Sequence, residues 1–66
     1  MPTGRDLILD AYGDAMKVLF ETLYKAYVDA AADGPMKQQA EQRFSAGAAL
    51  AVSVRDRALA LLPPGA

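Results

Sequence analysis

The chain has 66 residues, of which 53% are hydrophobic and 23% are charged, and its formal net charge is −1. This composition is too apolar for a disordered chain, which combines low hydrophobicity with high net charge. The sequence contains no cysteine, which excludes disulfides and thiolate metal sites, and no histidine, the commonest general base and metal ligand. The small net charge also argues against a strongly basic nucleic-acid-binding protein. We therefore expect a single small domain.

The sequence contains no pattern typical of a targeting signal or a membrane span. Asp10, Asp14 and Lys17 interrupt the apolar N-terminal segment too early for a signal peptide. The longest uncharged run, residues 44–54, is eleven residues long, whereas a membrane span needs about 20. We expect a cytoplasmic protein that does not enter a membrane.

The first predicted helix begins after Thr3, a residue type that caps helix N-termini. Asp6 follows at the position of the acidic partner in a capping box. Apolar residues then recur at steps of three and four along one broad face, which is typical of an amphipathic helix. They are Ile8, Leu9, Tyr12, Ala15, Met16, Leu19, Phe20, Leu23, Ala26, Tyr27 and Ala30. We expect this helix to span residues 4–33.

Residues 33–35, with the sequence Asp-Gly-Pro, predict a tight turn between two helices. Its glycine is the residue type that ends a helix in the left-handed conformation, and its proline suits the first turn of the next helix. The second helix is expected over residues 35–62, because Pro63 disfavours helical geometry in the residue before it, and a short tail follows at 63–66. Helices joined by so short a turn lie antiparallel. The predicted fold is therefore an all-α helical hairpin.

The second predicted helix carries an apolar stripe that is rich in small residues. The stripe comprises Met36, Ala40, Phe44, Gly47, Leu50, Ala51, Val54, Ala58 and Leu61, and a weaker strip of Ala48, Val52 and Leu59 lies beside it. Glycine within a helix costs about 1 kcal/mol relative to alanine. We therefore expect close packing of a partner helix at Gly47. At Gly13, close packing and a tolerated surface position are both open interpretations.

The apolar face of each predicted helix is wider than one partner helix can cover. Each helix is about 40 Å long, and we expect Tyr12, Phe20, Tyr27 and Phe44 to stay partly exposed in a single hairpin. The simplest remedy is self-association as a two-fold dimer that forms a four-helix bundle, although a higher oligomer is also open. Residues 1–33 carry a net charge of −3 and residues 34–66 carry +2, which favours pairing of unlike helices. The expected interface residues are Tyr12, Met16, Leu19, Phe20, Leu23, Tyr27, Phe44, Gly47, Leu50, Ala51 and Val54.

No group of residues predicts catalysis, a metal site or a bound cofactor. Asp6, Asp10 and Asp14 recur at steps of four, but a solvated acidic helix edge explains that spacing. Metal sites inside helical bundles use Glu-x-x-His motifs, and the chain has no histidine. Ser45 and Ser53 have no histidine base to activate them. The tyrosines on the apolar face suit core packing with the hydroxyl at the edge.

We therefore expect a non-enzymatic interaction or regulatory module that acts through helix–helix contacts, with itself or with an amphipathic helix of another protein. The alternative is binding of RNA or DNA, because helical-hairpin dimers of the plasmid copy-control (Rop) type bind RNA on one face of the bundle. That similarity is architectural and no motif matches. The basic residues of the alternative are Lys37, Arg43, Arg55 and Arg57. The more hydrophobic of the two predicted helices is net acidic, whereas helices that lie on a membrane surface favour Lys and Arg on their polar face, which argues against membrane binding.

Overall fold

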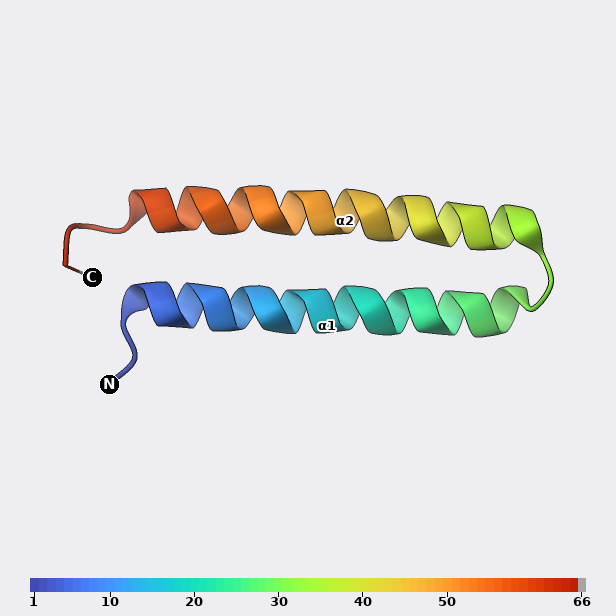
Figure 1. Cartoon of the computed structure of the whole chain (residues 1–66), viewed down its shortest axis with the longest axis horizontal. Coiled ribbons are helices and arrows are strands. Elements are labelled where there is room, and N and C mark those ends of the chain that lie inside the picture. Colours follow the sequence, from blue (N-terminus) through green and yellow to red (C-terminus); the bar gives the residue numbers. More distant parts are fainter. Residues whose placement is uncertain (66) are drawn as a thin grey trace.

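The computed structural model describes residues 1–65, and it confirms the predicted helical hairpin. Helix α1 (Gly4–Ala30) and helix α2 (Gly34–Leu61) lie antiparallel and side by side, joined by a short turn (Figure 1). The Cα atoms extend over 51 × 20 × 6 Å. The hairpin is therefore a single layer of helices, one helix thick.

The helix ends follow local hydrogen bonding. The Thr3 hydroxyl accepts a hydrogen bond from the Asp6 backbone N–H at 3.1 Å, and the Thr3 backbone N–H donates to the Asp6 carboxylate at 3.2 Å. This is the capping box expected from the sequence. At the far end of α2, Leu62 has extended backbone angles, φ −67° and ψ 138°. Helix α2 thus ends at Leu61, one residue before the expected end, because Pro63 disfavours helical geometry at Leu62.

The turn differs in detail from the sequence expectation. Helix α1 ends at Ala30, three residues earlier than expected, and the residue with positive φ is Ala31 (φ 52°) rather than Gly34. Gly34 is instead the first residue of α2. The reason is that the Asp33 carboxylate accepts a 3.0 Å hydrogen bond from the Met36 backbone N–H. Asp33 therefore caps α2, and α1 has to end before it.

Contacts along the hairpin define a regular antiparallel register. Arg55 lies over Tyr12 near the open end, Leu19 reaches Gly47 near the middle, and Lys37 lies over Tyr27 near the turn. The sum of the paired residue numbers stays between 64 and 67 along this length. The two helices therefore keep the same antiparallel register along the length of the hairpin.

The space between the helices is narrow and holds few buried residues. Among residues 1–65, only Ala30 and Ala40 are buried, at 5% and 8% exposure. The Leu19 side chain packs directly on Gly47, where an added Cβ would lie 2.7 Å from the Leu19 Cδ2 atom. The predicted close packing at Gly47 is therefore confirmed, and it occurs inside the hairpin. Gly13 has no atom within 4 Å of an added Cβ, so it occupies an open surface position.

The positive φ of Ala31 predicts that Ala31→Gly stabilises the hairpin. A residue with a Cβ is strained in this conformation, at a cost of about 1 kcal/mol or more, and glycine adopts it freely. Glycine also loses more backbone entropy on folding, so we expect a net gain of about 0.5 kcal/mol in the free energy of unfolding. Urea denaturation, monitored by circular dichroism, measures this change in the free energy of unfolding. A loss of stability would show that Ala31 is not strained.

The two helix glycines provide a matched pair of substitutions. Gly13→Ala is expected to raise the free energy of unfolding by up to about 1 kcal/mol, because alanine has the higher helix propensity and the site is open. Gly47→Leu is expected to lower it by about 1–3 kcal/mol, because the side chain collides with Leu19 and forces the helices apart. Thermal melts of both variants test this. Equal melting temperatures for Gly47→Leu and the wild type would contradict close packing at this point.

Candidate interaction surface

A single layer of two helices has two broad faces, and we name each by its residues. The groove face is the face on which Thr22 of α1 and Arg43 of α2 line one hollow, and Ala11 and Val54 line another. The aromatic face lies on the other side of the layer and contains Phe20. At 100° per residue, Phe20 is about 160° around α1 from Thr22. The two faces therefore offer separate surfaces to a partner.

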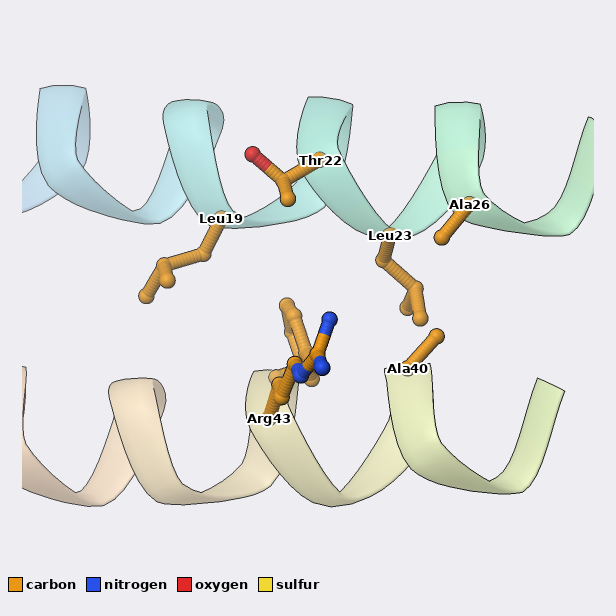
Figure 2. Close-up of a pocket in the computed structure, with 7 residues that line it drawn as sticks. Leu19, Thr22, Leu23, Ala26, Ala40 and Arg43 are labelled. Carbon is orange, nitrogen blue, oxygen red and sulfur yellow. The ribbon is translucent and has the colours of Figure 1, made fainter. Parts of the chain in front are cut away.

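The first hollow of the groove face lies towards the turn (Figure 2). It is lined by Leu19, Thr22, Leu23, Ala26, Ala40, Arg43 and Phe44. Figure 2 shows Leu19 and Leu23 directed from α1 towards α2, and Arg43 directed from α2 towards α1. Thr22 directs its hydroxyl to its own helix, where it donates a 2.9 Å hydrogen bond to the Val18 carbonyl oxygen. The floor of the hollow is therefore apolar, with Arg43 as its charged wall.

A second hollow lies towards the open end of the hairpin. It is lined by Ile8, Ala11, Tyr12, Ala51, Val54, Arg55 and Ala58. Three of these residues are alanines, whose small side chains leave room for the hollow. Larger apolar side chains lie next to the hollow on the surface. Those of the groove face are Leu7 (57% exposed), Val18 (61%), Met36 (48%), Leu50 (65%), Val54 (58%) and Leu61 (65%). Two of these residues belong to α1 and four to α2, so both helices expose large apolar side chains on this face.

The aromatic face is apolar mainly on α1. Leu9, Phe20 and Tyr27 are exposed there, at 39%, 61% and 40%. The Lys37 Nζ atom lies 5.6 Å from the Tyr27 ring centroid. Loss of hydration, with the nearby Glu41 carboxylate as a second cause, raises the pKa of Tyr27. Charged residues of α2 thus accompany the aromatic rings on this face.

The predicted interface residues divide into two groups. Seven of them are half-buried within one chain, on the side where its two helices meet: Tyr12, Met16, Leu19, Leu23, Phe44, Gly47 and Ala51. The other four are exposed large residues, Phe20 and Tyr27 on the aromatic face and Leu50 and Val54 on the groove face. The small residues of the α2 stripe and Phe44 thus pack against α1, while Leu50 and Val54 stay exposed. The weaker strip of Ala48, Val52 and Leu59 is half-buried.

Sequence reasoning missed part of the groove face on α1. Leu7 and Val18 were not assigned to an apolar face, although each precedes a residue of a hollow by four positions, Ala11 and Thr22 respectively. A step of four places both on the same side of the helix. This spacing could have predicted a second apolar side of the first helix, but the broader apolar stripe from Ile8 to Ala30 is more conspicuous in the sequence.

The four basic residues of the nucleic-acid alternative do not gather into one patch. The Arg55 guanidinium lies 4.6 Å from the Tyr12 ring centroid and forms a 2.9 Å ion pair with Asp56. Lys37 lies over Tyr27. Arg43 and Arg57 are 14 residues apart, which is about 21 Å along the helix. Phosphate binding needs cations that converge.

Residues 1–65 contain no cluster of three or more His, Cys, Asp or Glu side chains that could hold a metal ion. Neither helix is long and apolar enough to cross a membrane.

The spread of basic residues predicts weak binding to nucleic acid. We expect no saturable binding of a fluorescently labelled RNA duplex at low salt, as measured by fluorescence anisotropy. Tight binding that falls steeply as salt rises would contradict this, because such a slope reports several phosphate contacts.

No protein-family model matches this chain, and the comparisons found no matching curated protein and no matching solved structure.

Proposed function

We propose that this chain is a small, non-enzymatic interaction module that works as a homodimer, with two hairpins stacked into a four-helix bundle. The observation that carries the proposal is the amount of surface that one chain leaves in contact with water. Among residues 1–65, no large apolar side chain is fully buried: those between the helices are half-buried, and others stand exposed on the two broad faces. A second layer of helices would cover one of these faces.

The surface area supports a dimer quantitatively. One chain exposes 5071 Å², whereas a compact folded monomer of 7.0 kDa exposes about 4,000 Å². Each chain therefore exposes about 1,000 Å² more than a compact monomer, and covering that excess on two chains removes roughly 2,000 Å² from water. This is the lower end of the range for obligate homodimers. A second hairpin of the same length supplies a surface of matching size.

The shape of the hairpin supports the same proposal. Its radius of gyration is 15.4 Å, while a compact domain of this length has a radius of gyration of about 11 Å. Stacking a second layer on the first makes the particle thicker without making it longer. The dimer would thus approach the proportions of an ordinary four-helix bundle.

A second copy is the occupant that best fits the exposed surface. In a two-fold dimer, the same residues of each chain cover one another, so a face that is apolar on both helices is complementary to itself. The acidic first half and the basic second half of the chain also complement each other between copies. Exposed ion pairs contribute only about 0–1 kcal/mol each, so charge selects the pairing and apolar burial supplies the stability.

The proposal predicts a particle of twice the 7.0 kDa chain mass at micromolar concentration. Folding and association would then be coupled, so each tenfold rise in protein concentration adds about 1.4 kcal/mol of stability. This raises the melting temperature by about 5 °C for a dimer of this size. Sedimentation equilibrium gives the mass, and circular dichroism melts at several concentrations give the shift. A folded 7.0 kDa particle with a concentration-independent melting temperature would contradict the proposal.

The same measurement separates a second copy from another protein as the occupant. A folded monomer that forms a complex of defined mass only after a different chain is added would show that the surface serves a foreign helix. A monomer that stays unfolded at every concentration would show that another chain is needed for folding. Either result would contradict the proposed homodimer and favour binding of a different protein.

A further inference from the structure

We infer that the two hairpins stack through their groove faces, with each α1 lying over the partner's α2 and both turns at the same end of the bundle. The inference rests on the proposed homodimer and adds to it the face and the orientation of the contact. It is based on two features of the groove face: both helices expose large apolar residues there, and the outer edges of the two helices carry opposite charges.

The groove face has the apolar surface that stacking requires on both helices. Val18 of α1 and Leu50 and Val54 of α2 are each about 60% exposed on this face, and Val54 lines the second hollow. On the aromatic face, the large exposed apolar residues belong to α1, whereas α2 contributes Glu41 beside Tyr27. A helix of a second copy laid on the aromatic face would meet exposed large apolar side chains on α1 only, because Val52 and Leu59, which lie on the Glu41 side of α2, are half-buried. The groove face therefore offers the larger apolar contact.

The edges of the groove face carry opposite charges on the two helices. Arg43 lines the first hollow, and Arg57 stands beside Val54 and Leu61, so the edge on α2 is basic. The edge on α1 holds charged residues that follow Leu7, Val18 or Thr22 at helical spacing. They are Asp14, Glu21, Lys25 and Asp29, three acidic and one basic, with a net charge of −2. The edge on α2 carries +2 from its two arginines.

Two-fold stacking of flat hairpins allows two arrangements. If the symmetry axis runs parallel to the helices, α1 lies over the partner's α2, and the two turns are at the same end. If the axis lies in the layer plane and crosses the helices, α1 lies over the partner's α1, and the turns are at opposite ends. Both arrangements can cover the same face, so apolar burial does not choose between them.

Charge chooses between the two arrangements. With the axis parallel to the helices, the acidic edge of α1 lies beside the basic edge of the partner's α2, on both sides of the bundle. With the crossing axis, the acidic edges face each other and the two basic edges face each other. Like charges in close contact are destabilising by about as much as opposite charges are stabilising. The arrangement with both turns at the same end is therefore favoured.

Spin labels at the turn test the orientation. The described chain has no free cysteine, so a single Ala32→Cys variant carries one nitroxide per chain at an exposed turn position. Electron–electron distance measurement should give less than roughly 30 Å between the two labels, set by the width of a four-helix bundle. A distance near the 51 Å length of the hairpin would overturn the inference.

A second label position tests the homodimer separately from its orientation. Ala49 is exposed near the middle of α2, so labels at Ala49→Cys stay well within the hairpin length of each other in both arrangements. A measurable distance at position 49 with a long one at the turn rejects the orientation and keeps the dimer. No measurable distance at either position rejects the dimer, and the inference with it.

A matched pair of substitutions tests the face. Leu50 and Phe20 are equally exposed, at 65% and 61%, on opposite faces. Leu50→Glu is expected to weaken dimerisation on the order of a thousandfold, because two copies of the charge would enter one interface. Phe20→Glu is expected to weaken it by less than about tenfold, because a position outside the interface contributes little. The reverse ranking in sedimentation experiments would place the contact on the aromatic face, while equally strong dimers from both variants would exclude both faces.

Discussion

The structure depends on one geometric constraint: two helices side by side share a single line of contact, which leaves both broad faces of the layer uncovered. The contact line of this hairpin takes up small and medium side chains, with Gly47 fitted against Leu19. Only two alanines among the described residues become buried. Larger side chains such as Leu23 and Phe44 become only half-buried between the helices, and other large apolar residues stand exposed on the broad faces. This is a property of a one-layer architecture, because domains normally bury their apolar faces between at least two layers.

Local hydrogen bonding fixes where the two helices begin. The Thr3–Asp6 capping box begins α1, and Asp33 begins α2, so the turn is short and the two helices run back along each other. Cation–π contacts then join α1 to α2 towards each end, through Tyr12 with Arg55 and Tyr27 with Lys37. Such contacts contribute about 0.5–1 kcal/mol each at exposed sites. They hold the register, while the apolar flanks of the layer determine what can associate with it.

Much of the fold follows from the sequence because its signals are local. The steps of three and four along residues 8–30, the Asp-Gly-Pro turn and Pro63 predict two antiparallel helices, and these are present. Only the position of the turn differed, because the sequence shows that Asp33 and Gly34 are both helix-end residues but not which helix each one serves. The division of the α2 stripe could not be predicted in this way. Leu50 and Ala51 are neighbours on one stripe, and only the angle of contact with α1 decides that Ala51 is half-buried and Leu50 is exposed.

The central claim is that the chain is a single layer that a second layer covers in solution. Small-angle X-ray scattering measures this most directly, because it reports the mass and the cross-section of the particle together. The account predicts scattering from a particle of twice the chain mass, with a cross-section two helices thick and a length near the 51 Å of the single hairpin. A 7.0 kDa particle with the flat cross-section of one hairpin would contradict it.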